Sequence, residues 1–206
     1  ATTVVELELV THRKRSTSQN VVAETRPGAR RVLMVGAHLD SVREGPGIND
    51  NATGVAALLE IARVVRARYP QLSVRFGFWG AEELGLFGSR AYAQAVDRSR
   101  IVGYLNFDIL GSPSRDRAVY EGGPFAARWL AYFERRGVEA NSIDIAGRSD
   151  HFPFEQIGIP TGGVFAGGYA CYHRACDRVA NVDLALFDEL AAAAAFGVAS
   201  FAPLER

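Results

Sequence analysis

Four short apolar runs constrain the fold of this chain most strongly. They cover residues 31–37, 72–79, 101–107 and 160–165. Each run has the length of a strand, and its continuous hydrophobicity is typical of a strand buried on both faces of a parallel or mixed sheet. We therefore expect these runs to form the centre of one sheet.

Helical patterns separate the apolar runs. Apolar side chains recur at helical spacing over residues 52–69, and Pro70 ends this pattern. Further helices are expected over residues 88–96, 125–136 and 182–201. Strands that alternate with helices predict an α/β fold, in which a mixed, twisted β-sheet is sandwiched between helices.

The length of the chain favours a single domain. A chain of 206 residues, of which 48% are hydrophobic, can bury one sizeable core without disulfides. Neither a repeat nor a change of composition divides it, so we expect one domain over residues 1–206. Residues 2–10 and 19–24 are rich in β-branched side chains and predict a hairpin at one edge of the sheet, with His12 exposed in its turn.

Charge and hydropathy restrict the partners of this chain. It has 23 basic and 23 acidic side chains, whereas proteins that bind nucleic acid or anionic membranes usually carry a clustered basic excess. No apolar run reaches the roughly 18 residues that span a bilayer. We therefore expect neither a nucleic acid nor a membrane as partner. We also expect a monomer.

Side chains of the types that bind metals follow all four apolar runs. They are, in chain order, His38 and Asp40, then Glu82 and Glu83, then Asp108, and His173 in the loop after the fourth run. Because the carboxyl ends of parallel strands meet at one edge of a sheet, we expect these side chains to lie close together. Asp50, in a polar loop after the first run, faces the same edge. Two imidazoles with several carboxylates and no thiolate are typical of an open, catalytic zinc site.

Each of these residues also has a purely structural interpretation. A single histidine after a strand is more often a hydrogen-bonded residue at the rim of a sheet. Glu82 and Glu83 could stabilise the start of a helix through its dipole, and Asp50 and Asp108 could form turns. Four successive strands that all end in ligand-type residues are improbable on these grounds alone, so the coincidence favours a metal site.

Longer motifs around these residues resemble the M28 family of dizinc aminopeptidases, and in particular its secreted Streptomyces type. The motifs are, in chain order, GAHLDSV over residues 36–42, GINDN over 47–51, FWGAEELG over 78–85, NFD over 106–108 and CYH over 171–173. They keep the order of the family from about residue 32 to residue 183. The resemblance implies a metallo-aminopeptidase.

The resemblance also implies two zinc ions and their ligands. His38 and Asp108 would hold one ion, Glu83 and His173 would hold the other, and Asp50 would bridge the two. A shared carboxylate suits ions that lie roughly 3.5 to 4 Å apart, because separate ligand shells do not fit in that distance. Calcium is not expected, since Ala192 stands beside Asp188 where a further acidic ligand would be needed.

Further roles follow from the same resemblance. Glu82 would be the general base for a metal-bridged hydroxide, and the Tyr172 hydroxyl would stabilise the oxyanion. Asp40 would accept the second N–H of the His38 imidazole and fix its tautomer. Arg148 and Phe165 would contact the substrate or the product.

Cys171 and Cys176 flank His173. The resemblance implies a disulfide between them, which requires an oxidising compartment, so we expect a secreted, extracellular protein. Two free thiols are the alternative.

The expected activity is the removal of bulky apolar N-terminal residues from peptides with a free N-terminus. Another hydrolase of this type, such as a carboxypeptidase, a dipeptidase or a small-molecule amidase, is the alternative enzyme. A non-catalytic binding module on the same fold is the alternative outside catalysis.

Overall fold

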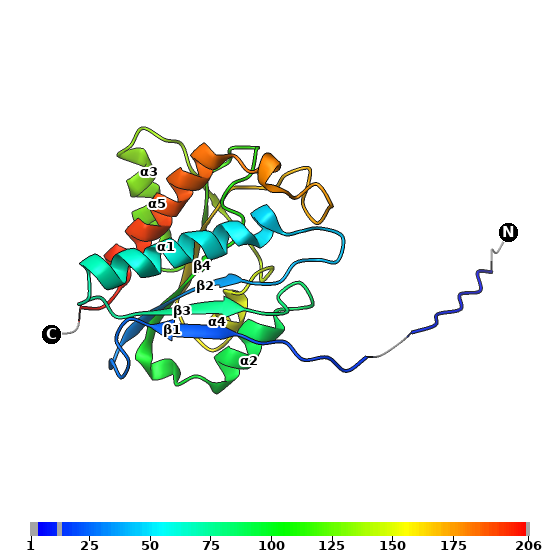
Figure 1. The fold of residues 1–206 in the computed structure, drawn as a ribbon, viewed down its shortest axis with the longest axis horizontal. Helices are drawn as coiled ribbons and strands as arrows, with labels where there is room; N and C mark the ends of the chain where they lie inside the picture. The colour runs from blue at the N-terminus through cyan, green and yellow to red at the C-terminus, as the bar shows by residue number, and fades with distance from the viewer. Residues whose placement is uncertain (1–3, 12–13, 205–206) are drawn as a thin grey trace.

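The structure is a computed structural model that describes residues 4–11 and 14–204. One seven-stranded sheet, in the order β1-β3-β2-β4-β7-β5-β6, forms its centre (Figure 1). The strands are β1 Val21–Glu24, β2 Val32–His38, β3 Val74–Trp79, β4 Ile101–Phe107, β5 Ala118–Tyr120, β6 Asn141–Ile143 and β7 Thr161–Phe165. The helices are α1 Thr53–Arg68, α2 Phe87–Ala95, α3 Ala126–Glu134, α4 Phe152–Gln156 and α5 Leu184–Phe201, with short turns η1 Ile48–Ala52, η2 Arg98–Arg100 and η3 Val179–Asn181.

The four apolar runs form the parallel centre of this sheet. Strand β2 pairs in parallel with β3 and β4, and β4 pairs in parallel with β7. Two outer strands are antiparallel to their neighbours, β1 against β3 and β5 against β7. The prediction of an α/β fold with a mixed sheet is therefore confirmed. The carboxyl ends of the four central strands lie at the same end of the sheet.

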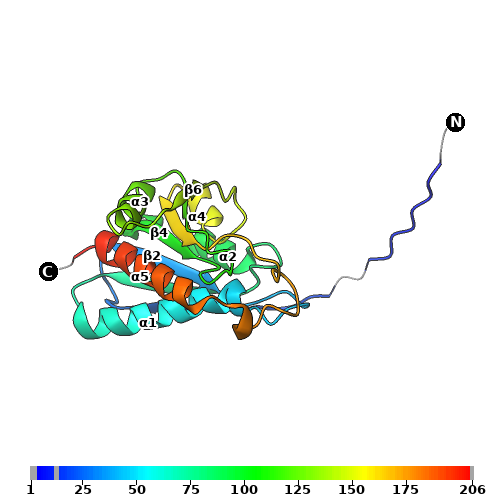
Figure 2. The same cartoon turned by 90° about the horizontal axis from the view of Figure 1, so that it is seen from above.

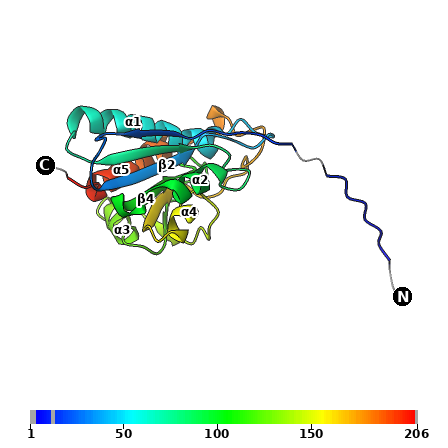
Figure 3. The same ribbon diagram turned by 90° about the horizontal axis from the view of Figure 1, so that it is seen from below.

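Helices cover both faces of the sheet, as Figures 2 and 3 show. Leu33 and Val35 of β2 belong to the core cluster that includes residues of α1, α3 and α5. Val32 and Met34 belong to the second cluster, with Ala93 of α2 and Phe154 of α4. Successive residues of a strand point to opposite faces, so the continuous apolar pattern of β2 is explained by burial against helices on both sides.

The elements missed by the sequence analysis are short. Strands β5 and β6 have three residues each, and helix α4 has five. Segments of this length carry too few residues for an apolar period to be read from the sequence. The longer helices and the four central strands lie within about three residues of their predicted bounds.

The predicted N-terminal hairpin is wrong. Strand β1 does lie at the sheet edge, where Val21 pairs with Phe78 of β3, but described residues 4–11 are not a strand and extend away from the fold. Val4, Leu7 and Leu9 are each more than three-quarters exposed. Side chains that stay in water gain no burial free energy to offset the entropy cost of ordering a strand. His12 lies outside the described residues.

Helix α5 is long and apolar enough, by length and composition, to cross a membrane, although the sequence analysis expected no such segment. Its buried residues include Leu186, Leu190 and Ala193, and the Trp129 indole N–H donates a hydrogen bond to the Ala193 carbonyl at 2.8 Å. These are the contacts of a helix that packs on the core of the fold.

Candidate active site

The sheet register brings two of the predicted ligands together. Gly36 of β2 pairs with Asn106 of β4, and His38 and Asp108 each lie two residues further along their strands. His38 Nε2 lies 3.4 Å from Asp108 Oδ1, and both residues are buried. Strand pairing therefore sets the position of this half of the site.

Asp50 lies between the two predicted histidine ligands. Its Oδ1 is 2.9 Å from His38 Nε2, and its Oδ2 is 3.3 Å from His173 Nε2. His173 Nε2 also lies 2.9 Å from Glu83 Oε2. The five residues predicted as ligands thus form one connected cluster, in which each carboxylate oxygen of Asp50 faces a different imidazole.

Burial and mutual repulsion disfavour the ionised forms of the carboxylates in this cluster. Burial, followed by the charge of Asp108, raises the pKa of Glu82 to about 9. Burial, followed by the charge of Asp50, raises the pKa of Glu83 to about 7. The pKa of Asp50 is also raised, first by burial and then by Asp108. A divalent cation among these oxygens would favour their ionised forms.

His38 and Asp108 form the best-compensated pair. Burial lowers the pKa of His38, but the charge of Asp108 and the hydrogen bond to Asp50 outweigh it, so the pKa is raised. Burial acts in the opposite sense on Asp108, where the neighbouring His38 nevertheless holds the pKa of the carboxyl below its usual value. Each member of the pair therefore stabilises the charged form of the other.

The donor set fits metal ions. Ligand atoms of His38, Glu82 and Asp108 lie within 4.8 Å of one another, as do those of His38, Asp50 and Glu83. Glu83 Oε1, Asp108 Oδ1 and His173 Nε2 are buried and have no hydrogen-bond partner. Unpaired buried oxygen and nitrogen atoms that converge on one space are the expected lining of a zinc site. Geometry alone also places Glu82 within reach of a metal, in addition to its expected role as a base.

Asp40 makes contacts different from those expected. The His38 Nδ1 atom lies 3.0 Å from the backbone carbonyl oxygen of Asp40, whereas the Asp40 carboxylate is 3.8 Å away. The carboxylate instead accepts hydrogen bonds from the backbone N–H groups of Glu82 at 2.9 Å and Glu83 at 3.2 Å. Because the chain turns after β2, the carbonyl orients the imidazole and the carboxylate holds the loop of the two glutamates.

Four of the six non-glycine residues with a left-handed backbone in the described part of the chain lie around the site. They are Ala81 (φ 59°), Leu86 (φ 59°), Ile109 (φ 56°) and His173 (φ 55°). Such conformations persist only where the surrounding structure enforces them, and they are commonest at functional sites. Each follows the end of a central strand closely or lies in the loop that bears His173.

The residues expected to contact substrate line two adjoining cavities. Tyr172, Arg148 and Asp108 border both of them, and Phe165 borders the smaller one. The smaller cavity has a volume of about 300 Å³, and its apolar lining also includes Ile109, Tyr120, Ile143 and Ile145. The larger cavity, of about 460 Å³, opens onto Asp50, Glu82 and Glu83. An apolar space therefore adjoins an acidic one.

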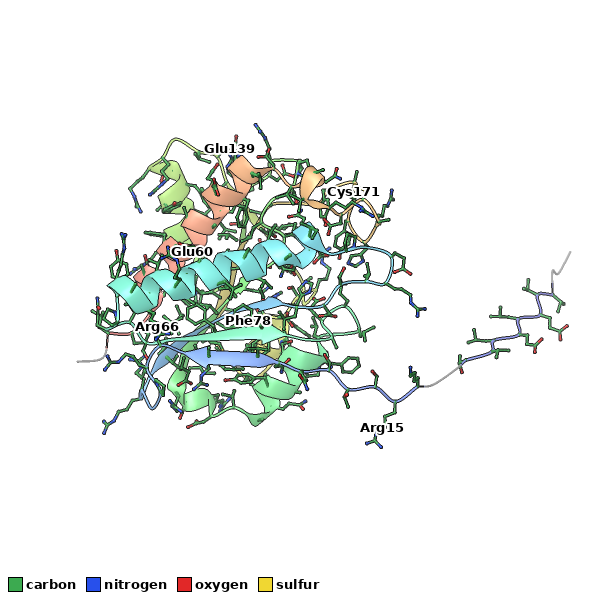
Figure 4. All side chains as sticks on the ribbon, viewed as in Figure 1. Arg15, Glu60, Arg66, Phe78, Glu139 and Cys171 are labelled. Atoms are coloured by element: carbon green, nitrogen blue, oxygen red, sulfur yellow. A yellow bond between two sulfur atoms is a disulfide. The ribbon has the colours of Figure 1, made fainter. Side chains whose placement is uncertain are left out.

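A disulfide closes the loop that carries Tyr172 and His173. Cys171 and Cys176 are bonded, with their Cα atoms 5.3 Å apart, which fits the pairing implied by the resemblance. The loop lies beyond the same end of the sheet as the carboxyl ends of β2 and β3, as the label of Cys171 in Figure 4 shows. Within it, the Tyr172 ring stacks on the His173 imidazole with centroids 3.8 Å apart.

A buried hydrogen-bond chain behind Asp108 was missed by the sequence analysis. The indole N–H of Trp79 donates to the Tyr104 hydroxyl, which donates to the Asn106 side-chain oxygen, both at 2.8 Å. The Asn106 amide donates to Ser149 Oγ at 2.8 Å, and this hydroxyl donates to Asp108 Oδ2 at 2.7 Å. The chain occupies Oδ2 and leaves Oδ1 facing His38. No local sequence pattern predicts this chain of hydrogen bonds, because its members come from three separate segments.

Asp150 and His151 lie buried behind the same region. Neither Asp150 carboxylate oxygen has a hydrogen-bond partner, and burial raises its pKa to about 7. The His151 ring lies 5.0 Å from the Tyr120 ring, centroid to centroid. His151 was not expected to bind metal, and it belongs to neither group of potential metal ligands among the described residues.

Comparison with known proteins finds one family. The sequence profile described as Peptidase family M28 matches residues 20–198. The chain is 41% identical to an aminopeptidase of Pseudomonas aeruginosa, over 83% of this chain and 39% of that protein. It is 40% identical to leupeptin-inactivating enzyme 1 of Streptomyces exfoliatus, over 89% of this chain and 48% of that protein.

A solved structure agrees with these relatives. The zinc aminopeptidase BSAP of Bacillus subtilis superposes with a TM-score of 0.81 at 26% identity, covering 91% of this chain and 51% of that chain. The chain spans less than half the length of the two curated relatives named above.

Proposed function

Because this chain belongs to peptidase family M28, we propose that it is a zinc-dependent aminopeptidase that removes bulky apolar residues from the N-termini of peptides. One observation carries the proposal: an apolar cavity adjoins a cluster of two imidazoles and four carboxylates at the carboxyl ends of the central strands. The relatives support the reaction class, since one of them is named an aminopeptidase and the superposed structure is a zinc aminopeptidase.

Zinc is the metal that the family and the donor set support. His38 and Asp108 would hold one ion, Glu83 and His173 the other, and Asp50 would contact both, as its two oxygens face the two imidazoles. When bound, zinc ions lower the pKa of water and polarise the scissile carbonyl. The remaining chemistry belongs to the side chains of the protein.

Glu82 is the proposed proton carrier. Its carboxylate takes the proton from the attacking water and returns it to the departing amine. Without metal, burial and the neighbouring Asp108 raise its pKa to about 9, whereas bound cations would favour the ionised form that accepts the proton. The Asp40 carboxylate, which accepts the backbone N–H of Glu82 at 2.9 Å, fixes the backbone from which Glu82 extends.

Two parts of the cleft would select the substrate. The acidic cavity around Glu82 and Asp108 would attract the free α-ammonium group, which a blocked N-terminus lacks. The cavity of about 300 Å³, lined by Phe165 and by Ile143 and Ile145, takes an apolar side chain. Arg148 lines both cavities, and its guanidinium is held by the Ile145 carbonyl at 3.0 Å.

Tyr172 would stabilise the negative charge that develops on the carbonyl oxygen. Its ring borders both cavities and stacks on His173. Burial, followed by the charge of Asp50, raises the pKa of its hydroxyl. The hydroxyl therefore stays protonated at neutral pH and serves as a hydrogen-bond donor.

The proposal also covers the domain organisation, the compartment and the oligomeric state of this chain. We expect residues 1–206 to contain one peptidase domain, because one sheet with its helices accounts for the described residues from β1 to α5. Export and a monomeric state are part of the same proposal. The Cys171–Cys176 disulfide supports export, since such bonds persist in oxidising compartments.

The Glu82→Gln variant tests the central step. It should keep its zinc and lose about 10²- to 10⁴-fold in kcat for leucyl-p-nitroanilide, the range typical of a general acid–base group. Glu83→Gln is the matched control, because it removes a proposed ligand and should lose zinc together with activity. If Glu82→Gln lost zinc and Glu83→Gln kept it, Glu82 would be the ligand. Full activity of Glu82→Gln would refute the mechanism.

Blocked peptides distinguish the alternative enzymes. N-acetylation of a leucyl peptide should abolish cleavage by an aminopeptidase, whereas a carboxypeptidase or an amidase would still cleave it. A zinc-loaded protein that hydrolyses nothing in a broad peptide library would favour the non-catalytic binding module.

A further inference from the structure

The Asp177 carboxylate is buried and binds the backbone beside Asp50. Its Oδ1 accepts the N–H of Asn49 at 2.9 Å, and its Oδ2 accepts the N–H of Asp50 at 3.2 Å. The backbone carbonyl of Asp177 accepts the N–H of Ile48 at 3.4 Å. Three successive N–H groups of the η1 turn therefore point to one residue, whose exposed fraction is 2%.

Asp177 also ends the loop that carries His173. It follows Cys176 of the disulfide directly, and its own N–H donates to the Arg174 carbonyl at 3.0 Å. The segment between β2 and η1 is in close contact with this loop, since a Cβ atom on Gly45 would lie 2.7 Å from the Arg174 carbonyl oxygen. The position of Asp177 is thus set by the loop of His173.

The other side chains of the η1 region are tied elsewhere. The Asn49 side-chain oxygen accepts the N–H of Gly111 at 2.9 Å, and the Asn51 amide donates to the Phe107 carbonyl at 3.0 Å. These bonds fasten the turn to the end of β4. The bonds to Asp177 instead fasten it to the loop of His173.

We propose that Asp177 is a positioning residue that couples the η1 turn to the disulfide-closed loop, so that Asp50 and His173 approach the same metal at a fixed separation. This inference rests on the proposed function for the identity of the metal. Asp177 itself touches neither substrate nor metal in this proposal, and acts through the backbone of Asp50.

The chemistry of the side chain accounts for the choice of aspartate. Two buried N–H donors need two acceptors, and a carboxylate offers one oxygen to each. An asparagine offers a single oxygen, and its NH₂ group would face the second N–H, donor against donor. Asp177→Asn therefore changes the hydrogen bonding while it keeps the size of the side chain.

Zinc retention tests the coupling independently of activity. Dialysis of Asp177→Asn against graded chelator should show about 10- to 100-fold weaker binding, the range typical of residues that orient metal ligands. Asp183→Asn is the matched control, because Asp183 accepts the N–H of Leu186 at the start of α5 and, within the described residues, makes no hydrogen bond to the η1 turn. It should lower the melting temperature without weakening zinc binding.

Two further variants make the test decisive. Asp177→Glu restores a carboxylate and should recover part of the zinc affinity lost in Asp177→Asn. Removal of the disulfide by Cys171→Ser with Cys176→Ser should also weaken zinc binding. Because both changes release the same contact between the η1 turn and the loop of His173, the combined variant should lose less zinc affinity than the product of the two separate losses. Independent, fully multiplying losses would overturn the coupling.

The inference and the proposed function fail in different ways. If Asp177→Asn melts at a lower temperature but binds zinc as tightly as wild type, Asp177 is only structural. If it binds zinc weakly while the wild-type protein hydrolyses no peptide, the positioning role stands and the aminopeptidase proposal falls.

Discussion

The two halves of the metal cluster are held in different ways. His38 and Asp108 end neighbouring parallel strands, and both are buried. Asp50 and His173 lie in loops, and the His173 side chain is 36% exposed. The strand-borne half takes its geometry from the register of β2 and β4, whereas the loop-borne half depends on a disulfide and on side chains that bind backbone N–H groups.

This contrast indicates where each half is vulnerable. Sheet pairing distributes its hydrogen bonds over many residues, so no single substitution removes the register of β2 and β4. The loops are held by few contacts, so the loss of one contact should move a ligand. Three predictions separate the halves, from the largest expected effect to the smallest, and a fourth tests the charge of the whole cluster.

Asp50→Asn should have the largest effect on metal content, because Asp50 belongs to the loop-borne half and also faces His38 of the strand-borne half. We expect zinc binding to weaken by more than the roughly 100-fold that is the upper range for residues that merely orient ligands. Asp40→Asn is the control, since its carboxylate binds the backbone of Glu82 and Glu83. Equal zinc retention in the two variants would contradict a bridging role for Asp50.

Removal of the disulfide should affect the loop-borne half alone. Closing so short a loop contributes about 2 kcal/mol to the free energy of unfolding, and urea denaturation of Cys171→Ser with Cys176→Ser should show this loss. Cobalt absorption spectra should change for the ion near His173 and not for the ion near His38. Wild-type protein treated with a phosphine reductant loses the same bond and should show the same spectral change, whereas a change at both ions would show that the halves are not separable.

Ser149→Ala should affect the strand-borne half. It removes the hydroxyl that binds Asp108 Oδ2 at 2.7 Å, and we expect about tenfold weaker zinc binding, the lower end for orienting residues. Ser73→Ala is the matched control, since the Ser73 hydroxyl is buried without a hydrogen-bond partner. If both variants bind zinc like wild type, strand pairing alone sets the Asp108 geometry.

The metal-free protein should lose stability as the pH rises. The pKa values of Glu82 and Glu83 are raised to about 9 and about 7, so between about pH 5 and 9 the folded state binds more protons than the unfolded state. The free energy of unfolding then falls with pH, by at most about 1.4 kcal/mol per unit for each such group. The raised pKa of His38 acts in the same direction.

Urea denaturation of chelator-treated protein at several pH values measures this slope. Zinc should abolish or reverse it, because bound metal favours the ionised carboxylates. If the free energy of unfolding of the metal-free protein were constant or rose over this pH range, the carboxylates of the cluster would not destabilise one another when ionised.

The predictability of the site follows the same division. His38, Glu82, Glu83 and Asp108 follow apolar runs, and the parallel strand rule places them at one edge. Ser149 and Asp177 were missed, because each binds its partner across more than 40 residues of sequence and neither lies in an apolar run. The Asp40 contact was misassigned, since only the turn after β2 decides whether the carbonyl or the carboxylate reaches the imidazole.

The sequence by itself determined the central sheet, its flanking helices and the edge at which the ligands gather, because strand burial and helical period are local patterns. Only the tertiary structure decided that residues 4–11 stay unpaired, that Asp50 faces both imidazoles and that Asp177 joins two loops. The reason is physical. Local patterns report which side chains are buried, whereas the partner of each buried polar atom depends on segments that meet only after folding.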